Sequence, residues 1–587
     1  MHIIKKFIST IVSAAIAVSA VPFYTVSAET EEHILFEGSA TSEFKKWGDD
    51  WNAAVSLGSD EFNISDFTKP FTIKVDYEST SEPILVMLSW TGGPSWAQMS
   101  PTYATNGTAY FKYDLISSEY GTDFSLLNAI NIMPSPSEDG ITVKKVSYVY
   151  ETDEDTKIEL NFSGLSGEII NDIDVGWNLG NTLDSNGDWI AQYSPGTPAD
   201  YETAWGNPQT TKHMIDSVKA AGFDAVRVPV TWRQHIDDSN GYKVDPEWMA
   251  RVKETVDYVI DNDMYCILNV HHDVGGESWL KASDANVTAN TEKFTALWTQ
   301  IANEFADYDN HLMFEGFNEI LDEDNNWVYP GKDAGDAVNK LNQIFVDTVR
   351  KTGGNNPERC IIVNTYAAGT GGSQLDDFVI PDDTAENAIM VQVHYYSPGS
   401  YCTEISEDGN EQKVWTENGG KSMIDGTLLN LYSHFTNKGV PVIIGEFAAA
   451  NKDNEFDRAE WAGYVVENAK KYGIRCFWWD AGGEFEINSD YGYYKGMSLY
   501  NRYNDEWVFP EIVKAITGVD VNDIKKDVKG DVNADGEFTI ADVIMMQKWI
   551  SAVSDIQLAN QKAGDLNEDN KLNVFDLCLM KHMLIEQ

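Results

Sequence analysis

Two glutamates are candidate reactive groups, because each follows an apolar run that is typical of a buried β-strand. Glu319 ends the segment FEGFNE, and Glu446 lies in IIGEF. A glutamate pair at one cleft can cleave a glycosidic bond, since one carboxyl protonates the leaving oxygen while the other attacks the sugar or activates water. A single glutamate after a strand is more often a salt-bridge partner or a helix cap. The hypothesis therefore depends on the pair and on its neighbours.

Polar and aromatic residues follow the other apolar runs in the same way. They are Asn178, Arg227, His271, His272, Asn318, Asn364, Tyr366, His394, Tyr396, Trp478 and Trp479. Such residues would line a cleft for a neutral, hydroxyl-rich ligand. His271 and His272 could instead bind a metal ion with the adjacent Asp273, but a zinc site would need a further ligand at suitable spacing.

The elements that would position these residues alternate between strands and helices. Strand-like runs occupy residues 174–180, 225–230, 265–270, 312–317, 360–364, 389–393, 441–445 and 476–480. Helical patterns occupy residues 211–221, 246–262, 291–308, 334–352 and 457–472. Eight strands with crossover helices predict an α/β fold, a (β/α)8 TIM barrel whose site lies at the carboxyl ends of the strands. An open doubly wound sheet is the alternative, but no GxGxxG or phosphate loop follows the first strand.

The barrel would span residues 157–518, with a further segment on each side. Residues 1–28 have two lysines, an apolar run and a small-residue cleavage pattern, which predicts a signal peptide; a membrane anchor is the alternative. Residues 29–150 contain short strand-like runs separated by turn residues, which predict an all-β sandwich. The acidic stretch 151–155 is a plausible boundary.

An internal repeat in residues 527–587 has the spacing of a calcium loop. Oxygen ligands recur at positions 1, 3, 5, 7, 9 and 12, with a backbone oxygen at position 7 and an aspartate at position 12. The first loop comprises Asp531, Asn533, Asp535, Glu537, Thr539 and Asp542, and the second comprises Asp565, Asn567, Asp569, Lys571, Asn573 and Asp576. Position 6 is Gly536 in the first loop and Asn570 in the second, and both residue types tolerate a positive φ. A solvated acidic turn is the alternative to two calcium sites.

Composition narrows the classes of partner. The chain has 587 residues, with 42 Lys and Arg against 93 Asp and Glu, a formal net charge of −51. This field would repel nucleic acid and anionic lipid, so neither is an expected partner. The 12% aromatic content, with 18 Trp, argues for folded domains. Three of the five cysteines, Cys266, Cys360 and Cys476, lie in apolar runs, so a disulfide framework is not expected.

Seven of the strand motifs, in order, resemble glycoside hydrolase family 5, most closely the endoglucanase and xyloglucanase branch called subfamily 4. The motifs are GWNLGNTLD, FDAVRVPVTW, LNVHHD, FEGFNE, VHYYSP, IIGEF and FWWD. The resemblance implies that Glu319 is the acid/base and Glu446 the nucleophile of a retaining enzyme without a catalytic cofactor. It also implies that Arg227 and Tyr396 adjoin the nucleophile and favour its ionised form.

The same resemblance implies further substrate contacts. Asn318 would bind the sugar 2-hydroxyl, and His271 and His394 would bind other hydroxyls. One of Trp478 and Trp479 would form the floor of the subsite at the cleaved bond; strand alternation turns only one of them inward, and Trp478 is taken as the candidate.

The terminal segments add binding functions to this expectation. The calcium repeat, with an apolar helix after each loop, resembles a dockerin, which implies a cohesin partner on a scaffold protein. Trp47, Trp51, Trp90, Trp96 and Tyr103 of the sandwich could stack on sugars, as in carbohydrate-binding modules.

The sequence therefore predicts a secreted, extracellular endo-β-1,4-glucanase (cellulase) that acts on plant cell-wall β-glucans as part of a cellulosome-like complex. A xyloglucanase, xylanase or mannanase of the same family and a non-catalytic carbohydrate-binding component remain alternatives.

Overall fold

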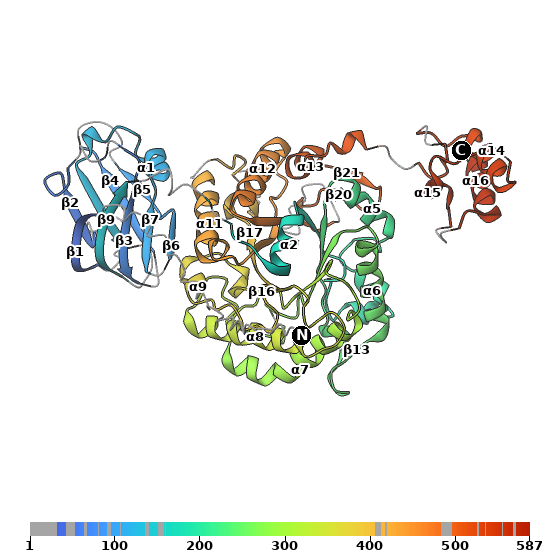
Figure 1. The fold of residues 1–587 in the computed structure, drawn as a ribbon, viewed down its shortest axis with the longest axis horizontal. Helices are drawn as coiled ribbons and strands as arrows, with labels where there is room; N and C mark the ends of the chain where they lie inside the picture. The colour runs from blue at the N-terminus through green and yellow to red at the C-terminus, as the bar shows by residue number, and fades with distance from the viewer. Residues whose placement is uncertain are drawn as a thin grey trace, which may run out of the picture.

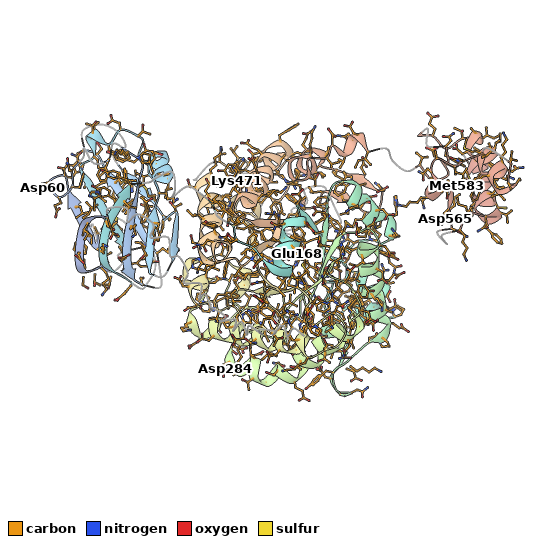
Figure 2. The ribbon with its side chains drawn as sticks, in the orientation of Figure 1. Asp60, Glu168, Asp284, Lys471, Asp565 and Met583 are labelled. Atoms are coloured by element: carbon orange, nitrogen blue, oxygen red, sulfur yellow. The ribbon has the colours of Figure 1, made fainter. Side chains whose placement is uncertain are left out.

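The computed structural model describes three folded parts along the chain (Figure 1). The described residues are 32–42, 53–63, 67, 69–79, 82–90, 96–105, 107–134, 140–150, 158, 160–276, 278–404, 412–416, 420–482, 496–524, 528–533, 536–553, 556–567 and 571–586. The predicted signal peptide and the acidic boundary at 151–155 lie outside these residues. Figure 2 shows side chains filling each part, with Asp60 in the first, Glu168 in the second and Met583 in the third.

The first part is a β-sandwich, as predicted. One sheet has the order β1-β9-β3-β7-β6 and the other β2-β8-β4-β5. Their bounds are β1 His33–Ser42, β2 Val55–Gly58, β3 Phe71–Glu78, β4 Pro83–Leu88, β5 Ala97–Met99, β6 Tyr103–Thr105, β7 Thr108–Phe111, β8 Ala129–Pro134 and β9 Ile141–Tyr150, with one short helix, α1 Tyr113–Glu119. Alternating apolar residues of both sheets, such as Ile73 and Val75 facing Leu85 and Ile132, form one buried core between them.

The second part is a closed parallel barrel, and each of its eight strands coincides with a predicted strand. The bounds are β10 Gly176–Leu179, β11 Ala225–Val228, β14 Tyr265–Asn269, β15 Leu312–Glu315, β16 Ile361–Asn364, β17 Ile389–Tyr395, β18 Val442–Phe447 and β19 Ile474–Asp480. The barrel closes where β10 pairs with β19. The expectation of a TIM barrel is confirmed, and the open doubly wound alternative is wrong.

The barrel helices cover the outside of the strands. The long ones are α5 Lys212–Ala220, α6 Pro246–Ile260, α7 Asp284–Glu304, α8 Lys332–Arg350, α11 Gly420–His434, α12 Glu455–Lys471 and α13 Pro510–Thr517. Shorter elements are α3 Ile190–Tyr193, α4 Pro198–Glu202, α9 Gly372–Asp376, α10 Gly399–Cys402, and the pairs β12 Ile236–Asp237 with β13 Lys243–Val244 and β20 Tyr500–Asn501 with β21 Glu506–Trp507. Helix α6 begins with Pro246 after the capping residue Asp245, and both residue types suit the first helical turn.

Strand alternation divides the barrel interior into two layers. The lower layer is apolar, with Ile267, Met313 and Phe477 among its residues, and helix α2 (Gly164–Asp172) packs against it. Two positions further along the strands, the inward side chains include Asn269 and Glu315, which are polar and fully buried. The site therefore lies at the carboxyl ends of the strands, above an apolar floor.

The third part is a small helical module, and its two long helices contain the two apolar runs after the repeats. They are α14 Ile540–Ile550 and α16 Val574–Glu586, with the short α15 Gln561–Gly564 between them. Val532, Met546 and Met580 form part of its core. All five cysteines are free, four of them buried and Cys578 exposed. Among the described residues, the membrane-span criteria of length, hydropathy and charge are met by no helix.

Candidate active site

Glu319 and Glu446 meet at the mouth of the barrel with His394 between them. The Nδ1 atom of His394 lies 2.6 Å from Oε1 of Glu319 and 3.5 Å from Oε2 of Glu446. One ligand atom from each of the three residues lies within 4.8 Å of the other two. Retaining glycosidases hold their carboxyl groups about 5–5.5 Å apart, whereas inverting enzymes keep about 6.5–9.5 Å for a water molecule. The geometry leaves no room for that water and suits direct attack by one carboxylate.

Arg227 holds Glu446 from inside the barrel. Its Nη1 atom donates to Oε1 of Glu446 at 2.7 Å and to Oδ1 of Asn178 at 3.0 Å. Its Nη2 atom donates to Oδ1 of Asn318 at 2.8 Å. The guanidinium is fully buried, so its charge acts on these groups with little screening by water.

The other oxygen of Glu446 faces the cleft and accepts a hydrogen bond from the Tyr396 hydroxyl at 2.8 Å. Burial raises the pKa of Glu446, while the charges of His394 and Arg227 and the Tyr396 hydrogen bond oppose this rise. The carboxylate is therefore desolvated but has donors on both oxygens. Desolvation makes it a stronger nucleophile, and the donors fix its direction.

His394 lies between the two glutamates and is affected by both. Burial alone would lower its pKa, but the neighbouring carboxylates of Glu446 and Glu319 outweigh burial and raise it. The side chain of Glu319 is 21% exposed, against 6% for Glu446. Glu319 therefore has access to the open side of the cleft, where a leaving sugar would depart.

His271 and His272 lie next to each other but have different partners. His271 is buried beside Asn269, and its ring is parallel to that of Trp479 with 5.7 Å between centroids. Burial lowers its pKa well below the usual range. His272 is 37% exposed and lies 3.9 Å from Asp184. Burial lowers the pKa of His272 to about 4, so both imidazoles are neutral at pH 7.

The suggested metal ligand Asp273 does not face this histidine pair. Its carboxylate accepts hydrogen bonds from the backbone N–H of Trp232 at 2.7 Å and the indole of Trp279 at 2.8 Å. A carboxylate oxygen of Asp184, in contrast, lies within 4.8 Å of a ring nitrogen of each histidine. Asp273 thus serves to hold two loops together.

The structure contradicts the choice of Trp478 as the substrate-facing tryptophan. Trp478 is fully buried beside Phe447 of β18 and Trp461 of α12, and its indole donates to the carbonyl of Met497 at 2.8 Å. The preceding residue Phe477 points into the barrel, so alternation turns Trp478 outward and Trp479 inward. Trp479 is the tryptophan that lines the site.

Sequence reasoning missed Glu315, which is the central acid of the interior. It binds Arg227 through two hydrogen bonds of 2.7 and 2.8 Å and accepts from Asn269 at 3.0 Å and Gln392 at 3.1 Å. The pKa of Glu315 is lowered, because the charge of Arg227 and its hydrogen bonds outweigh the effect of burial. The inward alternation from Met313 to Glu315 was the available signal. Tyr366, one of the polar residues noted after the strands, instead holds the loop after Glu319 through Asp322 and Asn326.

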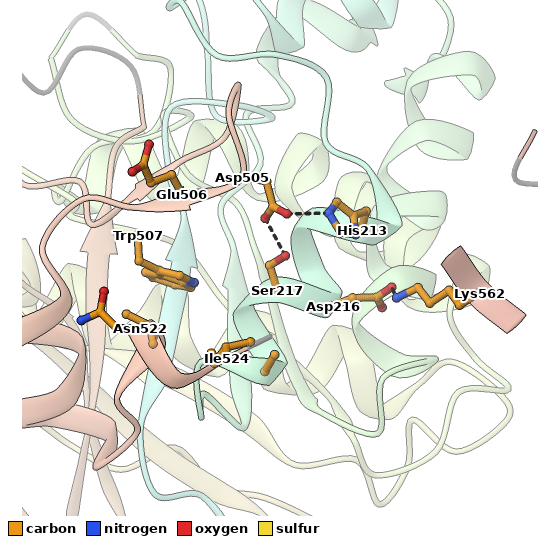
Figure 3. Close-up of a pocket in the computed structure, with 11 residues that line it drawn as sticks. His213, Asp216, Ser217, Asp505, Glu506, Trp507, Asn522, Ile524 and Lys562 are labelled. Carbon is orange, nitrogen blue, oxygen red and sulfur yellow. Dashed lines mark hydrogen bonds and ion pairs between the residues drawn. The ribbon is translucent and has the colours of Figure 1, made fainter. Parts of the chain in front are cut away.

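A second cavity, of about 400 Å³, lies between α5 and the segment around β21 (Figure 3). Its Asp505 carboxylate accepts from Ser217 and pairs with His213, each at 2.7 Å. Ser217 and His213 therefore both bind the carboxylate of Asp505. Nucleophilic catalysis would require His213 to bind the serine hydroxyl, which it does not do here. This cluster on the outer helical layer is an ion pair that joins α5 to the C-terminal part of the barrel.

In the C-terminal repeat, the aspartate at position 12 folds back over each loop. Asp542 accepts from the backbone N–H groups of Asn533 and Thr539 at 3.2 and 2.8 Å. Asp576 accepts from Asn567 and Asn573 at 3.4 and 2.9 Å. Gly536 has a φ of 95°, as position 6 requires. The predicted ligands Asp535 and Asp569, and Asn570, lie outside the described residues. The donor set is entirely oxygen and fits calcium.

In the sandwich, the predicted aromatic platform is described only in part. The side chains of Trp90 and Trp96 are 72% and 43% exposed. Trp47, Trp51 and the side chain of Tyr103 lie outside the part of the chain that the structure describes.

Two carboxyls at this spacing, with an arginine and a tyrosine on one of them, are the arrangement of a glycoside hydrolase. The family model "Cellulase (glycosyl hydrolase family 5)" matches residues 183–485, more than half of the chain. The chain belongs to glycosyl hydrolase family 5. Residues 36–146 match carbohydrate binding module 65 domain 1, and residues 529–585 match the dockerin type I domain.

The curated relatives include several proteins named endoglucanase. The chain is 42% identical over 354 residues to endoglucanase A of Clostridium longisporum. This alignment covers 60% of this chain and 65% of that protein. It is 37% identical over 353 residues to endoglucanase A of Ruminococcus albus, covering 60% and 91%. A match to the cellulase/esterase CelE of Acetivibrio thermocellus covers only 46% of that protein. The chain thus spans less than two thirds of the first and third of these relatives.

Solved structures agree with the barrel. A GH5-4 broad specificity endoglucanase from Ruminococcus champanellensis with bound cellotriose is 42% identical, with a TM-score of 0.55 over 61% of this chain and 99% of that one. A xyloglucan-specific endo-β-1,4-glucanase from a metagenomic library, in complex with cellotriose, is 36% identical, with a TM-score of 0.54 over 60% and 98%.

Proposed function

We propose that this chain is a secreted, retaining endo-β-1,4-glucanase that hydrolyses internal bonds of cellulose and related plant cell-wall β-glucans. The observation that carries the proposal is the close approach of Glu319 and Glu446 around His394. The endoglucanase names of its relatives support the substrate class.

In the first step, Glu446 attacks the anomeric carbon and forms a covalent glycosyl ester. Glu319 gives its proton to the departing glycosidic oxygen at the same time. In the second step, Glu319 takes a proton from water, whose oxygen attacks the same carbon and releases Glu446. Two inversions at that carbon retain its configuration, and both glutamates return to their starting states.

The neighbours of the glutamates position the substrate and stabilise the transition state. Asn318, held by Arg227, would bind the 2-hydroxyl, a contact that strengthens as charge develops on the sugar. Trp479 would form the apolar floor, in place of Trp478. His271 would bind a hydroxyl as a neutral imidazole beside it.

The preferred polysaccharide is an open part of the proposal. The solved relatives include broad specificity endoglucanases, a lichenase and a xyloglucan-specific enzyme. We propose β-1,4-linked glucans, including mixed-linkage glucan and xyloglucan, before xylan and mannan. We also propose that catalysis needs no metal or cofactor, because the steps above balance without one.

The test is release of reducing sugar from carboxymethylcellulose, mixed-linkage glucan, xyloglucan, xylan and mannan by the wild type and by Glu446→Ala. We expect cleavage of glucans by the wild type and none by the variant. NMR of the first product should show retained configuration. Inverted product would contradict the double displacement, and absence of activity on every polymer would favour a non-catalytic binding component.

We also propose roles for the flanking segments. Residues 1–28 would be a signal peptide, 29–150 a glucan-binding module, 157–518 the catalytic domain and 527–587 a dockerin with two calcium ions. The dockerin would bind a cohesin on a scaffold protein and place the enzyme in an extracellular, cellulosome-type complex. The match to the dockerin family and the fold-back of Asp542 and Asp576 support this assignment.

A further inference from the structure

The N-terminal sandwich contacts the barrel through the last strand of its five-stranded sheet. This strand, β6, lies against helices α9 and α11 (Figure 1). An edge strand has unpaired backbone groups and is usually protected or covered in a folded protein. Here the covering surface is part of the catalytic domain.

Two glycines of the barrel make the approach possible. A Cβ atom on Gly426 would lie 2.2 Å from the backbone oxygen of Thr102, and a Cβ on Gly372 would lie 3.0 Å from that of Ala104. Real Cβ atoms essentially never come within 3.0 Å of another heavy atom. The sandwich backbone therefore rests directly on the backbone of the two helices.

Gly426 has no other evident reason to be glycine. It lies inside α11 and has no positive φ. Glycine in a helix interior costs about 1 kcal/mol relative to alanine. The close contact with the backbone of Thr102 explains why this helix has a glycine here in spite of the cost in stability.

Glu82 and Tyr77 of the sandwich are half-buried at the same contact. Burial raises the pKa of Glu82, and the charge of Asp376 in α9 raises it further. Burial raises the pKa of Tyr77, and the charges of Glu82 and Asp376 raise it further. Asp376 is bound by the His434 Nε2 atom at 3.0 Å. Groups on a free tether would stay in water and would not be desolvated in this way.

We infer that the N-terminal module is docked on the α9–α11 face of the barrel in one fixed orientation, through backbone contact at Gly372 and Gly426. The partner of this surface is thus the chain's own sandwich. A polysaccharide bound by the module would keep a constant direction relative to the catalytic cleft. The docking itself does not depend on the proposed activity.

The test is a distance measurement between spin labels on the two parts of the full chain. Labels would be placed at Glu37→Cys in the sandwich and Glu358→Cys in the barrel, both exposed. Cys578→Ser removes the exposed native thiol, and the other four cysteines are buried. We expect one narrow distance distribution. A broad distribution in this otherwise wild-type chain would overturn the inference without any change at the contact.

A pair of glycine variants then tests the cause. Gly426→Ala should broaden the distribution, even though alanine favours the helix itself. Gly371→Ala is the matched control, since its Cβ would meet only the Gln374 side chain at 3.8 Å, and it should leave the distribution narrow. Turnover of a small aryl β-cellobioside should be equal in all chains, which shows that the barrel is folded. A narrow distribution in Gly426→Ala with normal turnover would refute the role of this contact.

Discussion

At the scale of single residues, the site separates two glutamates by environment. Glu446 is desolvated and held by Arg227 and Tyr396, whereas Glu319 reaches the open side of the cleft and contacts His394. The same residue type can therefore act as nucleophile in one place and as proton donor in the other. His394 lies between them, with Nδ1 2.6 Å from Oε1 of Glu319 and 3.5 Å from Oε2 of Glu446.

Glu319→Ala should affect substrates according to their need for a proton. With a cellulose oligosaccharide, whose leaving group is a poor one, we expect a loss of about 10²–10⁴-fold in kcat/KM, the usual contribution of a general acid. A dinitrophenyl β-cellobioside needs no proton, so its first step should be nearly unaffected. Stopped-flow release of dinitrophenol measures that step; an equal loss on both substrates would assign another role to Glu319.

Tyr396→Phe should move the acidic limb of the pH profile upward. The hydroxyl stabilises the ionised form of Glu446, so its removal raises a pKa that burial already raises. A lost hydrogen bond to a charged group corresponds to a rise of about one pH unit. The profile of kcat/KM with an aryl β-cellobioside measures this limb. A lower or unchanged limb would show that the tyrosine does not bind the carboxylate.

Glu315→Gln should act through Arg227. It keeps the shape of the buried side chain but removes the charge that fixes the guanidinium by two hydrogen bonds. We expect a lower kcat with little change in KM, together with lower stability, because Arg227 loses a buried counter-ion. Glu292→Gln at an exposed position of α7 is the control for loss of a surface charge. Calorimetry and steady-state kinetics together test both effects.

At the scale of elements, the loop after β15 is held rigidly although it carries exposed apolar side chains. Trp327 and Val328 are 61% and 83% exposed. Asp322 binds the N–H of Asn326, and Tyr366 donates to the carbonyl of that residue. The loop follows Glu319, so under the proposed mechanism it would lie on the side from which the leaving sugars depart.

Trp327→Ala should therefore weaken cleavage of long chains more than of short ones. Loss of one stacking contact of about 1 kcal/mol corresponds to roughly a fivefold fall in kcat/KM for cellohexaose. An aryl β-cellobioside, which has no sugar on that side, should be unaffected. Val328→Ala is the matched control. Equal losses on both substrates would place Trp327 outside the substrate path.

At the scale of the whole molecule, the parts divide their tasks. The barrel has its own apolar core and contains the proposed catalytic residues, and the helical module has a separate core around Met546 and Met580. The repeat loops place Asp531, Asp542 and Asp576 at buried positions. Without a cation, Asp531 and Asp542 of the first loop would repel each other, and Asp576 would be a buried carboxylate without a cation, so calcium and folding of the module should be linked.

Removal of calcium with a chelator should abolish cohesin binding and leave hydrolysis of soluble glucan intact. Asp542→Ala should reproduce this result without chelator, because it removes the position 12 ligand of one loop. Circular dichroism and a pull-down with cohesin report the module, and sugar release reports the barrel. Activity lost together with binding would show that calcium also supports the catalytic domain.

The sequence by itself determined the eight strands, the two glutamates and the C-terminal repeat, because strand periodicity and residue spacing are local signals. It did not determine which tryptophan faces the substrate, since both lie in the same strand; the structure places Phe477 in the interior, so Trp479 also points inward. Glu315 also went unrecognised, because its role depends on Arg227 from another strand. The contact at Gly426 joins residues from two separate domains. Tertiary structure alone decides such features, since each depends on the approach of segments that are distant in the chain.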